Sequence, residues 1–136
     1  MKNPDAIQAI VIGAGLSGLA AAKTLLDQGI NVRLLEAEPQ VAEPWRQRHP
    51  QLRLNIHQHF TQLPGMKMPR QKDTFVSRDK VVQYLEEYSK ELKPFIQLNV
   101  QVSRVAKTPT GWALETTSGP MHCEHLIIAT GRERVP

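Results

Sequence analysis

The sequence predicts one α/β domain built on a parallel β-sheet. Its 136 residues correspond to about one domain. Residues 7–12, apart from Gln8, and residues 126–129 are apolar runs without alternation, which is typical of strands buried on both faces of a sheet. Between residues 7–12 and a second candidate strand at 31–36, the apolar spacing is helical. A strand, a helix and a strand in this order predict a right-handed βαβ crossover.

Each element of this unit has a recognisable boundary. The first strand, residues 7–12, ends at Gly13, and the helix that begins at Leu16 ends at Gly29. The apolar positions of that helix recur at helical spacing: Leu19, Ala20, Ala22, Leu25 and Leu26. The second strand covers residues 31–36 and ends in an acidic residue, Glu36.

The remainder of the chain divides into an irregular excursion and a second ordered part. Residues 37–76 are rich in Pro, Gln, His and Arg without a sustained period, which predicts loops and short helices. Residues 79–92 predict an amphipathic helix with Ser77 as its N-cap. Further strands are expected at 95–98, 100–105, 112–116 and 126–129. The turn at 108–111 joins two of them into a small antiparallel meander.

Composition and charge narrow the classes of function. The net charge is +4, which suits an anionic ligand, while an aromatic content of 5% argues against an RNA-recognition module. The single cysteine, Cys123, cannot form an internal disulfide. The first apolar run is too short for a signal peptide or a membrane span. We therefore expect a soluble, cytoplasmic protein with no nucleic-acid or membrane partner.

The strongest chemical motif is the glycine-rich segment Gly13–Gly18, at the junction of the first strand and the first helix. In such a GxGxxG motif the first glycine permits a tight turn and the second lets a pyrophosphate approach the backbone. The third glycine lets the helix pack closely on the strand, and the anion lies at the helix N-terminus. Glu36, eighteen residues beyond Gly18, is placed to accept hydrogen bonds from ribose hydroxyls. The motif predicts a Rossmann-like dinucleotide site, but FAD and NAD share it.

Other chemistry receives little support. The spacings of His57 with His59, and of His122 with Cys123 and His125, match no standard zinc pattern, so no metal is expected. There is no serine on a recognisable nucleophile elbow and no convincing pair of catalytic carboxylates. Basic residues in the excursion favour a solvated loop over a phosphate site. Any reaction at this chain would therefore be the chemistry of its cofactor.

The sequence resembles the N-terminal, FAD-binding part of the class B flavoprotein monooxygenases, which include flavin-containing monooxygenases, Baeyer–Villiger enzymes and the plant YUCCA enzymes. The similar segments span nearly the full chain: GAGLSG with Ala22, Glu36, EPWR with Trp45, LRLN, LPGMKMP, VVQYLEEYS and IIATG. The resemblance implies a Rossmann-like FAD-binding domain over residues 1–136, with a parallel sheet, a small antiparallel meander and an irregular insertion at about 37–76.

The resemblance also implies roles for individual residues. The pyrophosphate would lie on Gly13, Gly15, Leu16, Ser17 and Gly18, and the adenosine ribose on Glu36 beside Ala37. Trp45 corresponds to the tryptophan that ends a Gly-Gly-x-Trp segment near the flavin. Glu43 and Pro44 replace small residues of that segment, which removes backbone freedom there.

Three further positions are implied in the same way. Asn55 corresponds to an asparagine beside the reactive face of the flavin and is the one candidate catalytic residue, although an asparagine is also common in turns. Val102 lies in the strand that passes the adenine. Ala129, Thr130 and Gly131 correspond to the motif that closes over the dinucleotide.

In function, the resemblance implies the FAD-binding portion of an NADPH-dependent flavin monooxygenase, which oxygenates N, S or carbonyl substrates through a flavin C4a-peroxide. The chain stops at Val135-Pro136, where the family continues into a second glycine motif for NADPH, and it lacks the FxGxxxH signature. We expect the chain alone to be incomplete as an enzyme, with the NADPH-binding domain and much of the substrate pocket absent.

Several alternatives remain open at this point. The chain could be a fragment, half of a split enzyme, an excised domain or a complete small flavin binder. A non-catalytic FAD- or NAD-binding module is the second functional class. A flavin disulfide reductase would need a Cys-x4-Cys pair, which these residues lack. An uncovered apolar sheet surface would favour a homodimer.

Overall fold

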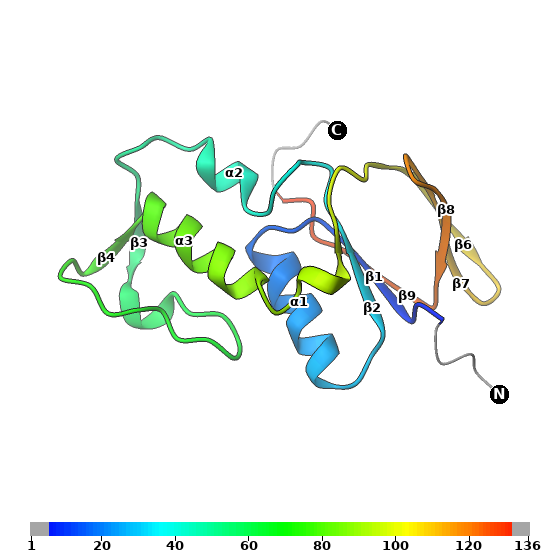
Figure 1. Ribbon diagram of the computed structural model, residues 1–136, viewed down its shortest axis with the longest axis horizontal. Helices are drawn as coiled ribbons and strands as arrows, with labels where there is room; N and C mark the ends of the chain where they lie inside the picture. The colour runs from blue at the N-terminus through cyan, green and yellow to red at the C-terminus, as the bar shows by residue number, and fades with distance from the viewer. Residues whose placement is uncertain (1–5, 132–136) are drawn as a thin grey trace.

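The computed structural model describes residues 6–131, in which a four-stranded parallel sheet separates a helical layer from an antiparallel meander (Figure 1). The sheet has the order β5-β2-β1-β9, with β1 at Ala9–Ile12, β2 at Val32–Leu35, β5 at Ile96–Gln97 and β9 at His125–Ile128. The helix α1 (Leu16–Asp27) connects β1 to β2, so the predicted βαβ unit is present. All three strand pairings are parallel, which confirms the α/β fold class.

The two faces of the sheet bury different side chains because successive strand residues point to opposite sides. Val11 and Leu34 face the helical layer and pack with Leu19 of α1 and Leu85 of α3 (Arg78–Ser89). Ile10 and Leu35 face the meander. Each face therefore has its own core, and the sheet is covered on both sides as parallel sheets require.

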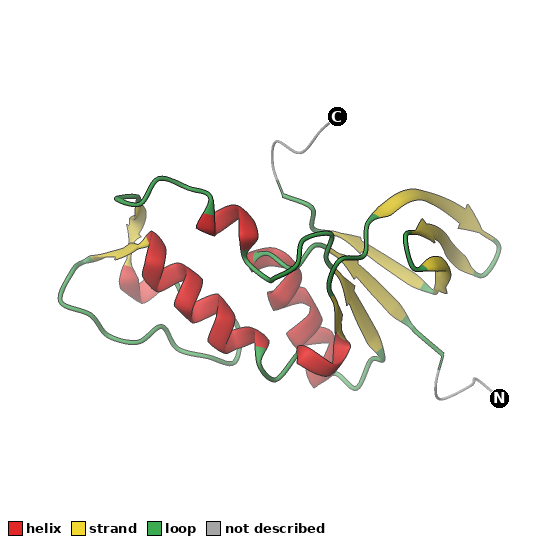
Figure 2. Cartoon of the chain, turned by 45° about the horizontal axis from the view of Figure 1, so that its top comes forward, coloured by secondary structure: helices red, strands yellow, loops and turns green. Residues whose placement is uncertain are grey.

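The meander consists of β6 (Val102–Thr108), β7 (Gly111–Thr116) and β8 (Gly119–Cys123), paired in that order. Leu114 and Cys123 supply its buried side chains against the sheet. Figure 2 shows the meander and the helices on opposite sides of the parallel strands. The predicted turn at 108–111 joins β6 to β7, with Gly111 at φ 147°.

The segment between β2 and α3 is more ordered than predicted. It contains the short helix α2 (Glu43–Arg46) and the 3₁₀ turn η1 (Gln58–Phe60), as expected, but also two strands, β3 (Arg53–His57) and β4 (Phe75–Ser77). These strands pair antiparallel and form a separate two-stranded arm at the N-terminal end of α3 (Figures 1 and 2). The strands were missed because four of the five residues of β3 are exposed, so the sequence shows no buried alternation.

Other element boundaries also differ from the predictions. The predicted helix at 79–92 runs from Arg78 to Ser89, and the predicted strand at 95–98 is reduced to two residues because Pro94 lies in the 3₁₀ turn η2 (Lys93–Phe95). Strand β8 was not predicted because Gly119 and Pro120 disfavour strands, yet an edge strand tolerates both. The predicted cap is confirmed, since Ser77 Oγ accepts a hydrogen bond from the Lys80 N–H.

Among residues 6–131, no helix is long and apolar enough to cross a membrane. Val135 and Pro136, the last two residues of the sequence, lie outside the described residues.

Candidate functional site

The glycine-rich turn lies at the carboxyl end of β1 and has the geometry that its three glycines predict. Gly13 adopts φ 104°, a left-handed conformation that favours glycine. A Cβ atom on Gly18 would collide with the Gly13 carbonyl oxygen, so helix α1 can approach β1 this closely only without a side chain there. Gly15 differs, because a Cβ on it would meet no heavy atom within 4 Å. The first and third glycines thus build the turn, and the second borders open space.

The N-terminus of α1 is open to an anion. Gly15 is its N-cap and supplies no side-chain hydrogen bond, and the first turn contains no acidic residue. The first N–H groups of a helix have no partner within the helix, and its dipole favours negative charge at this end. The backbone at Leu16 and Ser17 is therefore suited to phosphate oxygens.

Glu36 lies beside this turn, directly after β2, and is the one buried charged residue of the described chain, with 6% of its surface exposed. Its carboxylate accepts hydrogen bonds from two backbone N–H groups, at 2.7 Å from Ala14 N to Oε2 and 2.9 Å from Glu38 N to Oε1. These bonds offset the cost of burying the charge. Each oxygen retains acceptor capacity. The carboxylate therefore supports the glycine turn and can also accept hydrogen bonds from hydroxyl groups.

The end of β9 closes the same edge of the sheet. The Ala129 N–H donates to the Ile12 carbonyl at 2.8 Å, and a Cβ on Gly13 would collide with the Ala129 carbonyl oxygen. Gly131 has φ 85°, so the chain turns sharply here as predicted. Ala129 and Thr130 therefore lie against the first glycine of the motif, and Gly131 follows directly in the chain.

The segment leading into β6 reaches this edge from the other side. The Val100 N–H donates to the Glu36 carbonyl at 2.9 Å, and the Asn99 N–H donates to the Glu38 carbonyl at 3.1 Å. Val102 begins β6 two residues later and packs in the meander-side core. Val102 therefore follows two residues after a segment that is hydrogen-bonded to the backbone on either side of Ala37.

Helix α2 is attached to the glycine turn by its backbone. The Ala42 N–H donates to the Ala14 carbonyl at 3.2 Å, and Ala42 is fully buried in the left-handed conformation at φ 61°. Trp45, three residues on, packs against the helical-side core, with the Arg48 guanidinium 5.2 Å from its ring centroid. Pro44 occupies the first turn of α2, where its missing N–H costs nothing. Ala14 and Ala42 are contacts of the site that sequence reasoning missed, because both act through backbone atoms and carry no side-chain signal.

Asn55 is not gathered with these residues. It lies in β3, on the opposite side of the strand from Leu54, and is exposed. The arm formed by β3 and β4 is separated from the parallel sheet by the length of α3 (Figures 1 and 2). The structure places Asn55 in a strand and not in the turn considered as its alternative.

The described residues show no group of three or more His, Cys, Asp or Glu side chains that could hold a metal ion. Cys123 is buried, and burial raises the pKa of its thiol, which keeps it protonated and unreactive. The His122 ring lies 3.3 Å from the hydroxyls of Thr108 and Thr110 on the exposed meander.

A glycine turn, an open helix N-terminus and a buried carboxylate at the carboxyl edge of a parallel sheet define a Rossmann-like dinucleotide-binding fold. In a comparison with known families, the family described as pyridine nucleotide-disulphide oxidoreductase matches residues 10–136. The chain belongs to this family.

The most similar relatives include monooxygenases and uncharacterized oxidoreductases. The chain is 33% identical over 135 residues to a probable indole-3-pyruvate monooxygenase of Arabidopsis thaliana, YUCCA9, covering 93% of this chain and 32% of that protein. It is 32% identical over 127 residues to the uncharacterized oxidoreductase CzcO of Bacillus subtilis, covering 93% of this chain and 37% of that protein. The chain thus spans about a third of the length of these curated relatives.

Solved structures share the fold of this chain. A flavin-containing monooxygenase from Stenotrophomonas maltophilia superposes with a TM-score of 0.85 at 26% identity, covering 97% of this chain and 41% of that one. The bacillithiol disulfide reductase Bdr from Staphylococcus aureus has the same fold, with a TM-score of 0.84 at 22% identity over 93% of this chain and 39% of that one. The resemblance to the FAD-binding part of class B flavoprotein monooxygenases is confirmed.

Proposed function

We propose that this chain is the FAD-binding portion of an NADPH-dependent flavin monooxygenase that oxygenates nitrogen, sulfur or carbonyl substrates. The observation that carries the proposal is the pairing of the open α1 N-terminus with the buried Glu36 carboxylate at one edge of the sheet. One group suits a pyrophosphate and the other a ribose, and FAD contains both. When bound, FAD would supply the redox chemistry.

The residues at this edge fit such a ligand. The space over Gly15 admits a phosphate to the backbone N–H groups of Leu16, Ser17 and Gly18. Glu36 would accept the ribose hydroxyls with its remaining lone pairs, next to Ala37. The backbone of Val102 would face the adenine, and Ala129, Thr130 and Gly131 would cover the dinucleotide from β9.

Two residues are proposed for the flavin end. Trp45 would pack beside the isoalloxazine from α2, which the Ala42–Ala14 hydrogen bond fixes to the glycine turn. Asn55 would offer an amide that both donates and accepts hydrogen bonds at the reactive face. Its exposed position on the arm leaves the side chain accessible.

The proposal is tested by titrating FAD into the purified chain and following flavin fluorescence. Gly15→Ala is the informative variant, because its Cβ meets no protein atom and yet occupies the space assigned to the pyrophosphate. We expect it to fold normally and to bind FAD about tenfold more weakly or worse, equivalent to about 1.4 kcal/mol. Equal FAD affinity in Gly15→Ala and the wild type would contradict the proposed site.

A control on the opposite layer is Ser118→Ala, at an exposed position of the turn between β7 and β8. It should leave the FAD affinity unchanged. Because the chain spans about a third of the relatives' length, we expect it to take up FAD without sustained NADPH oxidation. Robust NADPH oxidation by the 136-residue chain would overturn that expectation.

A further inference from the structure

Helix α2 is too short to keep its position without contacts to other elements. It has four residues, Glu43–Arg46, and isolated helices shorter than about 12 residues are not stable in water. Its start is fixed at the glycine turn, where the Ala42 N–H donates to the Ala14 carbonyl at 3.2 Å. The direction in which Trp45 points therefore depends on what holds the remainder of this helix.

The end of α2 is held by Arg78, the first residue of α3. Its guanidinium Nη1 donates to the Arg46 carbonyl at 3.1 Å and to the Arg48 carbonyl at 2.7 Å. Cationic side chains commonly satisfy the last carbonyls of a helix in this way. With both ends fixed, α2 retains one freedom, which is rotation about its own axis.

The Arg46 side chain removes that freedom. Its Nη2 donates to Glu86 Oε1 at 2.5 Å, across from α2 to α3. Glu86 follows Arg78 by eight residues, which is about 12 Å along α3. Two contacts this far apart fix the rotation of α2. Successive helix residues point about 100° apart, so a rotation that moves Arg46 moves Trp45 by the same angle.

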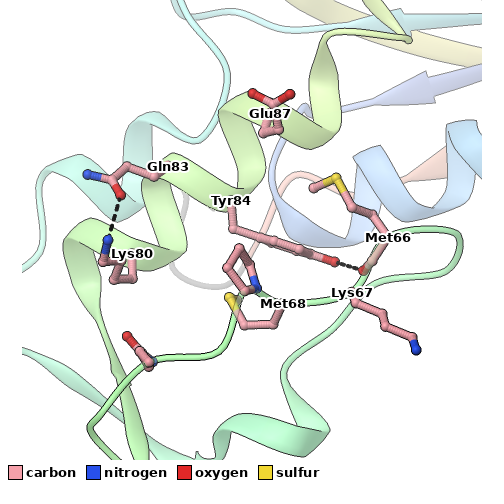
Figure 3. A pocket seen from close by; sticks show the side chains of 9 residues that line it. Met66, Lys67, Met68, Lys80, Gln83, Tyr84 and Glu87 are labelled. Atoms are coloured by element: carbon pink, nitrogen blue, oxygen red, sulfur yellow. Dashed lines mark hydrogen bonds between the residues drawn. The ribbon is translucent and has the colours of Figure 1, made fainter.

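Helix α3 is a rigid support for this contact. Leu85 is fully buried in the helical-side core. Tyr84 OH donates to the Met66 carbonyl at 2.5 Å, as Figure 3 shows. Tyr88 OH donates to the Pro64 carbonyl at 2.6 Å. Because α3 is held at all these points, the carboxylate that it offers to α2 has a fixed position.

The environment of Arg46 indicates a positioning role. Its side chain is 24% exposed, and its Nε is buried without a hydrogen-bond partner among the described residues. Glu43 Oε2 lies 3.7 Å from this Nε and accepts a hydrogen bond from Gln40 Nε2 at 2.6 Å. A buried donor without an acceptor is unfavourable. The guanidinium thus holds Glu86 while one of its own hydrogen bonds is missing, so stability alone does not explain its position.

We propose that Arg46 is a positioning residue, which orients Trp45 toward the bound flavin through its ion pair with Glu86. The inference rests on the proposed function, because it concerns the flavin end of the FAD site. Arg46 acts through Trp45 and makes no contact of its own with the flavin. An indole quenches flavin fluorescence on contact, so the emission of bound FAD reports the orientation of Trp45.

The test compares the emission of bound FAD between variants, with the bound fraction measured by dialysis. Trp45→Phe gives the emission without the quenching indole. Arg46→Met keeps the aliphatic stem without the charge, and Glu86→Gln removes the partner charge. Each should raise the emission at least about twofold toward that of Trp45→Phe. The FAD affinity should fall less than about threefold, because the glycine turn and Glu36 are unchanged.

Two further variants separate this role from a general effect of charge. The double variant Arg46→Met/Glu86→Gln should be no brighter than either single variant, because both changes break the same contact. Lys90→Met is the matched control, since it breaks the ion pair of Lys90 with Glu87, which lies within α3 and its C-cap and does not reach α2. It should leave the emission unchanged.

The outcomes distinguish this inference from the function on which it rests. If the wild-type chain retains no FAD, both are wrong. If FAD is retained and Arg46→Met is no brighter than the wild type, or Trp45→Phe is no brighter, the inference alone is wrong. In the chain without FAD, Arg46→Met should also speed amide exchange at residues 45–47 at least about threefold. Unchanged exchange there would overturn the inference.

Discussion

The sheet edge around Gly13 and the arm formed by β3 and β4 are stabilised in different ways. At the sheet edge, backbone groups meet directly: the Ala129 N–H bonds the Ile12 carbonyl and the Gly13 N–H bonds the Leu35 carbonyl at 2.7 Å. In the segment that connects β3 to β4, side chains bind backbone: Tyr84 and Tyr88 of α3 and Gln58 of η1 hold residues far from them in sequence. The sheet edge therefore depends on glycines that carry no side chain. The segment near the arm depends on the side chains of particular residues.

The largest effect should come from adding a methyl group at the sheet edge. Gly18→Ala places a Cβ against the Gly13 carbonyl, so the turn or the helix must move. We expect a loss of about 3 kcal/mol in the free energy of unfolding, measured by urea denaturation. Gly15→Ala, three residues earlier, should lose less than about 1 kcal/mol because its Cβ has open space. Equal stability losses in the two variants would contradict this description of the turn.

The arm should be most sensitive at Tyr84. Tyr84→Phe leaves the Met66 carbonyl and the Leu63 N–H without their shared partner. We expect a loss of about 2 kcal/mol, together with faster amide exchange in residues 63–68. A phenylalanine at Tyr88, which loses one hydrogen bond, should cost about half as much. An unchanged exchange rate in this segment would show that the tyrosines do not hold it.

Alkaline pH should weaken the same contacts. Burial and the neighbouring Tyr84 raise the pKa of Tyr88 from 10.0 to about 12. The unfolded chain then ionises first, so the contribution of Tyr88 is present below pH 10 and is lost as pH rises toward 12. At pH 11 the wild type should lose about 1.4 kcal/mol relative to pH 9 through this group, whereas Tyr88→Phe should lack that part. Parallel stability profiles for the two proteins would refute the raised pKa.

The smallest effect is expected at Ala42, whose left-handed conformation is unusual for alanine. Ala42→Gly relieves that strain but removes a buried methyl group and adds freedom to the unfolded chain. The terms oppose one another, so the free energy of unfolding should change by less than about 1 kcal/mol in thermal melts. A larger loss would mean that the Ala42 methyl group matters more than its backbone conformation.

The contrast between the two regions also explains what the sequence could predict. The βαβ unit, the glycine turn and Glu36 were predictable because strand and helix periods and the Gly13–Gly18 spacing are local signals. The strands β3 and β4 were not, because their pairing joins residues as distant as Arg53 and Ser77, and β3 is largely exposed. The Tyr84 and Gln58 contacts likewise link residues 13 or more positions apart, and no single window contains them.

The candidate site likewise contains some features that the sequence predicts and others that it does not. The positive φ of Gly13 and Gly131 and the close approach at Gly18 follow from residue type. The Ala14 N–H that binds Glu36 and the Ala42 N–H that binds Ala14 use backbone atoms, which any residue supplies. Only a structure could reveal that the buried Glu36 carboxylate supports the glycine turn through the Ala14 N–H.

The central claim, that this sheet edge holds FAD, is tested most directly by equilibrium dialysis of the purified chain against equal concentrations of FAD and NAD. The account predicts that FAD is retained in preference to NAD, and that Glu36→Gln weakens FAD retention while the far-side variant Ser118→Ala does not. Preferential retention of NAD, or of neither dinucleotide, would contradict it.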